Sequence, residues 1–220
     1  MKKIPKVFHT FWLSEDEILD EFKQNFETWK KHNPNFNLHI HRANEYEDLR
    51  KKISFLDTAL TKKKWCYAAD YLRSKVLDVE GGVYLDGDVI CYKSLDELIK
   101  NREYVVGVES MTDKIECAVL MFAPGNIIMK KMVEWYENWT PDKGFVLMPY
   151  LLEDVMKENN LEFDEVLDRE FVSGVKSYKW NKDDVTNTKD LVRIHTHTDK
   201  SYTMHNFTHT GYGPLGFSNH

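Results

Sequence analysis

Apolar residues recur along the chain with two different spacings, which predict a succession of strands and helices. The run from Ile4 to Trp12 predicts a first strand. Apolar residues then recur at helical spacing over 15–31, and Asn33 with Pro34 is a stop signal. Residues 36–42 alternate apolar and polar positions, as a half-buried strand does. Alternation of strands with helices predicts an α/β domain.

The most informative stretch of this pattern is 67–92. Its first half has apolar residues at helical spacing and ends at a double glycine beginning with Gly81, where a left-handed helix cap would lie. Strand-forming residues follow at 83–85, and the run then reaches Asp86 and Asp88 on either side of a glycine. We therefore expect these two carboxylates at the exit of a buried strand.

The remainder of the chain continues the same alternation. The strand expected over 117–123 is apolar throughout, as a strand buried on both faces should be. The other expected elements are one or two short helices between 44 and 64, helices over 94–100, 127–139 and 145–158, and strands over 104–109, 161–167 and 170–172.

Size and charge limit the classes of protein that remain. A chain of 220 residues with 42% hydrophobic content is long enough for one full core, so we expect a single domain. The net charge is -6, and the longest basic tract is the three lysines 62–64, which argues against nucleic-acid binding.

Cysteine usage and hydropathy bear on location. The three cysteines have no Cys-x-x-Cys spacing, which favours reduced thiols in the cytoplasm. No run approaches the roughly 20 apolar residues of a membrane-spanning helix. We therefore expect a cytoplasmic protein, with peripheral association at the inner face of the membrane left open.

Two pairs of charged residues are the candidates for chemistry. Asp86 and Asp88 offer carboxylate oxygens of the kind that Mg²⁺ and Mn²⁺ prefer. Asp70 and Arg73 lie three positions apart on the predicted helix, so both project from one face. Taken alone, the first pair also fits a solvated turn, and the second a surface ion pair.

Histidines supply a second set of candidates. His39 and His41 share one face of a predicted strand and could bind zinc together, although a solvated polar face fits better because no further ligand lies nearby in sequence. The C-terminal third has more histidines, including His195, His197 and His205. Their alternation with threonine fits a polar strand face as well as it fits zinc.

Taken together, several strings resemble one known family. They are I-P-K-V-F-H-T-F-W near the start, A-x-D-x-L-R, G-G-V-Y-L-D-x-D, K-S-L-D-E-L and, near the end, Y-T-M-H. The chain thereby resembles the sugar transferases with an Asp-x-Asp motif, which include bacterial capsular-polysaccharide transferases and yeast-type initiating mannosyltransferases. The clostridial glucosylating toxins are more distant relatives.

This resemblance implies the nucleotide-diphospho-sugar transferase A (GT-A) fold, a single Rossmann-like domain with a mixed central sheet. The first half, 1–92, is expected to bind nucleotide sugar and metal. The second half, 93–220, is expected to bind the acceptor and to end in a lid segment.

The resemblance also implies roles for individual residues around the metal. Asp88 is expected to bind Mn²⁺ or Mg²⁺ directly, Asp86 directly or through water, and His205 as an additional ligand. Asp70 is expected to hydrogen-bond sugar hydroxyls, and Arg73 to hold the sugar or the diphosphate. Asp70, Arg73, Asp86 and Asp88 are the catalytic candidates.

Further donor contacts follow from the same resemblance. Thr10 and Trp12 are expected at the nucleotide base, Tyr67 beside the donor, and Thr210 at the metal or a phosphate. Two positions depart from the family pattern: Asn206 stands where a second histidine is expected, and Gly211 where a tryptophan is expected.

The function implied is a metal-dependent, retaining glycosyltransferase. It would move a sugar from a nucleotide-diphosphate donor to a saccharide or another hydroxyl acceptor, in synthesis of a bacterial surface polysaccharide or glycoconjugate. UDP-hexose is the favoured donor, with a GDP-sugar possible. Two alternatives are a nucleotide-sugar hydrolase and a catalytically retired domain that binds sugar or a partner protein. Neither the acceptor nor the oligomeric state is indicated.

Overall fold

The computed structural model of the protein describes residues 2–110, 112–179 and 192–206. The strands are β1 (Val7–Phe11), β2 (Asn37–His41), β3 (Gly82–Leu85), β4 (Val89–Cys91), β5 (Tyr104–Val105), β6 (Val119–Phe122), β7 (Val175–Lys179), β8 (Val192–Thr196) and β9 (Thr203–His205). The helices are α1 (Asp20–His32), η1 (Ala43–Tyr46), α2 (Glu47–Arg50), α3 (Ser54–Thr61), α4 (Trp65–Val79), α5 (Asp96–Ile99), α6 (Ile127–Glu137), η2 (Pro141–Lys143), α7 (Met148–Glu158) and α8 (Arg169–Val172).

A mixed sheet forms the centre of the molecule. Within the described residues it has five strands in the order β2-β1-β3-β6-β5. Strand β1 runs parallel to β2 and β3, whereas β6 runs antiparallel to β3 and β5. The α/β class and the mixed central sheet expected from the sequence are confirmed.

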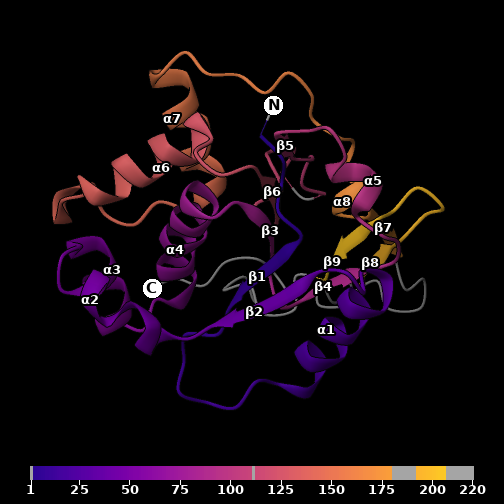
Figure 1. The fold of residues 1–220 in the computed structure, drawn as a ribbon, viewed down its shortest axis with the longest axis horizontal. Helices are drawn as coiled ribbons and strands as arrows, with labels where there is room; N and C mark the ends of the chain where they lie inside the picture. Colours follow the sequence, from indigo (N-terminus) through magenta and orange to yellow (C-terminus); the bar gives the residue numbers. More distant parts are fainter. Residues whose placement is uncertain (1, 111, 180–191, 207–220) are drawn as a thin grey trace, which may run out of the picture.

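Helices cover both faces of this sheet (Figure 1). Successive residues of β3 point to opposite faces, so Tyr84 packs with α3, α4, α6 and α7, whereas Val83 and Leu85 pack with α1 and α5. Helix α1 follows its predicted period, because Phe22, Phe26 and Trp29 are its buried residues. The core therefore lies in two layers, one on each side of β3.

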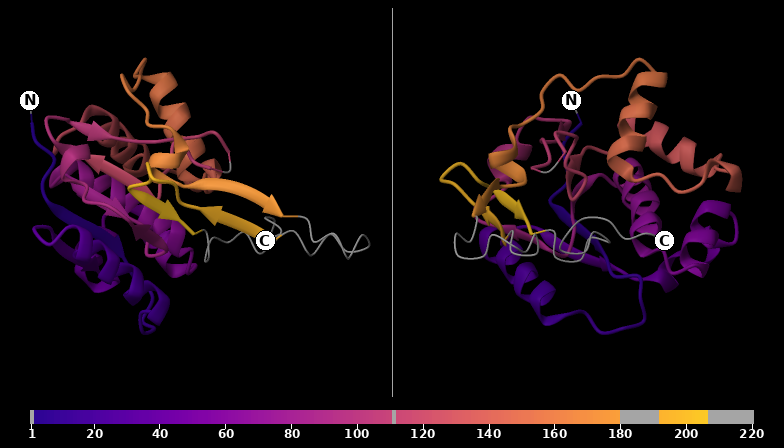
Figure 2. Two further views of the ribbon diagram at one scale, coloured as in Figure 1. Left: turned by 90° about the vertical axis from the view of Figure 1, so that its right-hand side faces the viewer. Right: turned by 180° about the vertical axis from the view of Figure 1, so that it is seen from behind.

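Two small sheets lie beside the central one. Strand β4 continues from β3 and pairs antiparallel with β9, which brings Val89 opposite His205. Strands β7 and β8 form an antiparallel hairpin, and Figure 2 shows this hairpin extending away from the central sheet. The pairing of β4 with β9 carries the end of the described chain back to the exit of β3.

The junction between α4 and β3 has the predicted cap. Gly81 follows the last helical turn with a φ of 67°, a left-handed conformation that favours glycine. A side chain there would also collide with Pro124, since a Cβ atom would lie 2.7 Å from the proline ring. The helix thus ends where the double glycine predicts.

Several predicted boundaries are wrong. The helix expected from residue 15 begins at Asp20, because the preceding loop is held by the Trp12 indole, whose Nε1 donates to the carbonyl of Asp16 at 2.8 Å. The helix expected from 145 begins at Met148, and that expected over 94–100 covers only Asp96–Ile99.

The strands expected in the second half also need correction. Residues 170–172 lie in the helical turn α8, where the Ser173 N–H donates to the carbonyl of Arg169 at 2.8 Å. The strand expected over 104–109 is only Tyr104–Val105. The strand expected over 161–167 is reduced to one bridge between Gly107 and Leu167.

Candidate active site

The site is built on a tight turn that links β3 to β4. The N–H of Val89 donates to the carbonyl of Asp86 at 3.0 Å, which closes the turn. The Asn25 side chain, on α1, donates to the carbonyl of Gly87 at 2.8 Å. On the other side, the N–H of Asn206 donates to the carbonyl of Asp88 at 3.1 Å. Helix α1 and the segment after β9 therefore fix the turn from two directions.

The turn and β9 bring together the three metal ligands predicted from the sequence. Asp86, Asp88 and His205 each offer a ligand atom, and these atoms lie within 4.8 Å of one another. The side chain of Asp86 is 30% exposed, whereas those of Asp88 and His205 are 8% and 6% exposed. Two carboxylate oxygens and an imidazole nitrogen, with one carboxylate open to solvent, fit Mn²⁺ or Mg²⁺.

The His205 ring lies between two carboxylates. Its Nε2 is 3.4 Å from Oδ1 of Asp88, and its Nδ1 is 3.2 Å from Oε1 of Glu116. Burial disfavours the charged imidazolium, but Glu116 and Asp88 outweigh burial and raise the pKa of His205 well above its ordinary value. Burial alone would raise the pKa of Glu116, but His205 and hydrogen bonds hold it below its ordinary value.

Arg73 joins the other two candidate carboxylates in the interior. Its Nη2 is 3.0 Å from Oδ1 of Asp70 and 3.5 Å from Oδ1 of Asp86. Its Nη1 donates to the carbonyl of Cys117 at 2.6 Å, and the guanidinium lies 4.3 Å from the centre of the Tyr84 ring. The Arg73 side chain is only 6% exposed, so these contacts make it the link between α4 and the turn. Contact of Arg73 with a substrate stays a prediction.

Asp70 lies where α4 meets the start of α7. Burial raises the pKa of Asp70 to about 6, Arg73 opposes this rise and Asp86 adds to it, while a hydrogen bond from the backbone of Met148 opposes it again. Met148 is the first residue of α7, so the positive end of this helix faces the carboxylate. Asp70 is thereby fixed beside Asp86 through their shared arginine.

The residues predicted to bind the rest of the donor lie on neighbouring elements. Thr10 is buried in β1, and Trp12, just after β1, packs edge-on against Phe22 with ring centres 5.4 Å apart. Tyr67, in the first turns of α4, packs against Phe145 at 4.8 Å. Thr210 and Gly211 lie outside the described residues. Binding of nucleotide by Thr10, Trp12 and Tyr67 stays a prediction.

Sequence reasoning missed two residues of this site. The Tyr84 hydroxyl donates to Oδ1 of Asp86, and Glu116 faces His205. Glu116 immediately precedes the apolar run of β6, which is antiparallel to β3, so its place at the exit of β3 follows only once that pairing is known. A single acid before a strand is too common a pattern to have indicated this role.

A second histidine group lies on the other side of β3. His9 on β1 lies between His39 and His41 on β2 and the carbonyl of Gly81, and the three histidines could offer ligand atoms within 4.8 Å. His9 was missed because it comes from another strand. Its Nε2 pairs with the carbonyl of Gly81 at 3.1 Å, and its Nδ1 pairs with Nε2 of His41 at 2.9 Å.

These contacts form a hydrogen-bonded chain. The Tyr46 hydroxyl lies 2.6 Å from Nδ1 of His41 and completes it. Because a carbonyl only accepts, His9 donates from Nε2 and accepts at Nδ1 from His41, which in turn accepts from Tyr46. All four ring nitrogens of His9 and His41 are used, and both rings are neutral. The group therefore fits an internal hydrogen-bond chain better than a zinc site.

The hydrogen bonds of His9 and His41 predict a pH dependence of stability. Burial lowers the pKa of His9 to about 4 and that of His41 to about 3, from an ordinary value of 6.5. Below pH 6.5 these histidines bind protons in the unfolded state but not in the folded state. Their contribution to the free energy of unfolding is therefore complete above pH 6.5 and is lost as the pH falls. Urea unfolding should show a loss of up to about 1.4 kcal/mol per pH unit for each histidine.

Two variants serve as controls for this prediction. His41→Gln removes one titrating ring and should make the slope shallower, whereas His39→Gln removes the exposed neighbour and should leave most of it. An unchanged dependence of stability on pH in His41→Gln would contradict its assignment to the hydrogen-bonded histidines.

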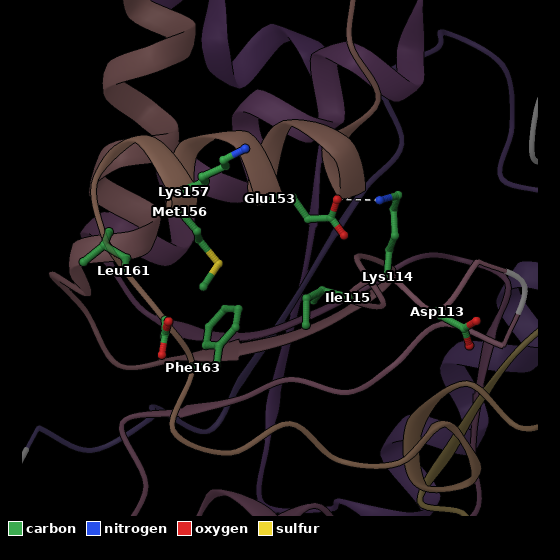
Figure 3. Close-up of a pocket in the computed structure, with 9 residues that line it drawn as sticks. Asp113, Lys114, Ile115, Glu153, Met156, Lys157, Leu161 and Phe163 are labelled. Atoms are coloured by element: carbon green, nitrogen blue, oxygen red, sulfur yellow. Dashed lines mark hydrogen bonds and ion pairs between the residues drawn. The ribbon is translucent and has the colours of Figure 1, made fainter.

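A pocket of about 420 Å³ lies between α7 and the segment 113–115 (Figure 3). The ion pair between Lys114 and Glu153, at 2.5 Å, lies along one side of it. Its apolar lining comes from Ile115, Met156, Leu161 and Phe163. None of the predicted site residues that the structure describes lines this pocket.

Comparisons with known proteins relate part of the chain to a glycosyltransferase family. Residues 20–105 match the family model described as the glycosyltransferase sugar-binding region containing the DXD motif. The sequence matches no curated protein. No helix among the described residues has both the length and the apolar character needed to cross a membrane.

Solved glycosyltransferases have a similar fold. The PaToxG glycosyltransferase aligns over 72% of this chain and 70% of its own, with 18% identity and a TM-score of 0.58. A glycosyltransferase involved in glycosylation of the major capsid of PBCV-1 aligns over 76% and 84%, with 13% identity and a TM-score of 0.47. The galactosyltransferase LgtC aligns over 76% and 75%, with 13% identity and a TM-score of 0.44.

The fold is that of the GT-A glycosyltransferases, and residues 20–105 match the DXD region of a glycosyltransferase family. More particularly, residues 20–105 carry the sugar-binding region with the DXD motif, which here is Asp86-Gly87-Asp88. The resemblance to this family, the GT-A fold and the enzyme class expected from the sequence are confirmed.

Proposed function

We propose that the protein is a metal-dependent, retaining glycosyltransferase that moves a hexose from UDP to a hydroxyl group of a saccharide or glycoconjugate. The observation that carries this proposal is the convergence of Asp86, Asp88 and His205 at the exit of β3. The ion held there would be Mn²⁺ or Mg²⁺, because two of the three ligands are carboxylates. The choice of UDP over GDP rests on the resemblance to bacterial relatives.

Each residue then has a physical task. Asp86, Asp88 and His205 would hold the ion, and the ion would offset the negative charge of the departing nucleotide diphosphate. Asp70 orients the sugar by accepting hydrogen bonds from its hydroxyls. Arg73 keeps the carboxylates of Asp70 and Asp86 in fixed positions, since it contacts both from the interior.

Retention follows from attack on the face that the leaving group vacates. The bond from the anomeric carbon to the diphosphate oxygen breaks, and the acceptor oxygen bonds to the same face of that carbon. The acceptor proton passes to the departing diphosphate. This route requires no nucleophile from the protein. The family resemblance to retaining enzymes supports it, and so does the ion pair of Asp70 with Arg73, which engages that carboxylate.

The proposal includes a place in the cell. Polymers of this kind are assembled from nucleotide sugars, so we propose that the protein acts in the cytoplasm, at the inner face of a bacterial membrane. The three cysteines support this location, because Cys66, Cys91 and Cys117 are all free thiols.

Product analysis tests the reaction. The protein should be incubated with Mn²⁺, a set of UDP-hexoses and a panel of saccharide acceptors, and the products separated by mass. We expect one donor to yield a glycosylated acceptor with its anomeric configuration retained. Free hexose as the sole product would instead identify a hydrolase. No turnover, together with no metal-dependent donor binding, would identify a retired domain.

A further inference from the structure

We propose that Glu116 is a positioning residue, which orients the imidazole of His205 so that Nε2 faces the metal site. This inference rests on the proposed function, because it concerns how this chain prepares one ligand of that metal. Glu116 belongs neither to the DXD turn nor to the segment of β9, and it contacts His205 from the segment that leads into β6.

Glu116 is held from several sides. Its Oε1 accepts from the N–H of Ala118 at 3.0 Å, and its Oε2 accepts from the hydroxyl of Ser173. Its own N–H donates to the carbonyl of Gly107 at 2.8 Å. The residue is 1% exposed, so water cannot substitute for these partners. The carboxylate is therefore a fixed point inside the protein.

The orientation of His205 follows from this fixed point. Oε1 of Glu116 is 3.2 Å from Nδ1 of His205, and a carboxylate accepts hydrogen bonds. Glu116 therefore favours the proton on Nδ1, and a metal ion next to Asp88 would displace the proton of Nε2 and take its lone pair. Because β9 pairs with β4, rotation of the ring is the remaining freedom of this ligand, and Glu116 restricts it.

A purely structural role for Glu116 predicts different results. In that case its bonds to Ala118 and Ser173 would matter for folding, and loss of Glu116 would lower stability without changing how His205 meets the metal. Thr203→Val is a matched control, because Thr203 lies on the same strand as His205 and its buried hydroxyl donates to the carbonyl of Val172 at 2.7 Å. This variant loses a buried hydrogen bond but leaves Glu116 untouched.

The test measures the bound metal rather than activity. Wild-type protein loaded with Mn²⁺ and UDP should show, in electron spin-echo spectra, the nitrogen modulation of a coordinated imidazole. In Glu116→Ala this modulation should be lost, and Mn²⁺ affinity should fall by about 10- to 100-fold. Glu116→Gln keeps an acceptor for Nδ1 and should lose less affinity than Glu116→Ala, and Thr203→Val should behave as wild type.

Wild-type affinity with full nitrogen modulation in Glu116→Ala would overturn the positioning role while leaving the proposed function intact. Wild-type protein that binds no Mn²⁺ would overturn the proposed function, and this inference with it. If Glu116→Ala does not fold, nitrogen NMR of the Mg²⁺-loaded wild type decides the matter. We expect the His205 proton on Nδ1, and a proton on Nε2 instead would overturn the inference.

Discussion

Replacement of Asp88 by asparagine should lower kcat/KM for sugar transfer by about 10³-fold, which corresponds to ~4 kcal/mol of lost transition-state stabilisation. Asparagine keeps the volume of the side chain but removes the charge that would hold the metal. The Asp88 side chain is 8% exposed, so no water shell can replace that charge. The measurement is the initial rate of UDP-hexose turnover at saturating Mn²⁺.

The same variant should stay folded. The turn is held by backbone groups of Asp86, Gly87 and Asp88, none of which changes, and Glu116 still faces His205, so circular dichroism should show a folded protein. Asp48→Asn is the matched control, because Asp48 is 89% exposed in a surface ion pair with Lys51. Equal activity of Asp88→Asn and Asp48→Asn would exclude a catalytic role for the DXD turn.

Replacement of Arg73 by methionine should lower the free energy of unfolding by about 3–5 kcal/mol, because it leaves the buried carboxylate of Asp70 without its counter-charge. Arg73 contacts Asp70 and Asp86 and donates to the carbonyl of Cys117. Methionine fills much of the same volume, so the loss is electrostatic. Urea unfolding followed by circular dichroism measures it.

A double variant separates charge from packing. Arg73→Met combined with Asp70→Asn removes the stranded carboxylate as well, and should recover part of the stability that Arg73→Met loses. Arg73→Lys keeps the positive charge but not the planar fork of donors, and should lie between wild type and Arg73→Met. A loss below about 1 kcal/mol in Arg73→Met would show that the interior pairs contribute little.

The sequence predicts the fold best where one periodicity persists over a complete element. Helix α1 buries one regular stripe, and the ends of α4 and β3 are marked by Gly81 and the carboxylates after residue 85. Prediction fails where a side chain from elsewhere decides the local backbone. The Trp12 indole holds the loop before Asp20, and residues 170–172 are too few to distinguish a helical turn from a strand.

The site residues also differ in whether a local pattern or a contact from a distant segment identifies them. Only Gly87 separates Asp86 from Asp88, so the pattern alone places both carboxylates at the strand exit, and the family resemblance then favours a metal site over a solvated turn. His205 needed the family resemblance, because its pairing with β4 spans more than a hundred residues. Tyr84, Glu116 and the full contact set of Arg73 appear only after β3, β6 and α4 are assembled.

The central claim is that Asp86, Asp88 and His205 form a metal site that binds the diphosphate of the donor. Calorimetric titration of the wild-type protein with UDP, in the presence of Mn²⁺ and again after chelation with EDTA, tests it most directly. We predict saturable binding of UDP with Mn²⁺ and none after chelation. Equally tight binding of UDP under both conditions would contradict the claim.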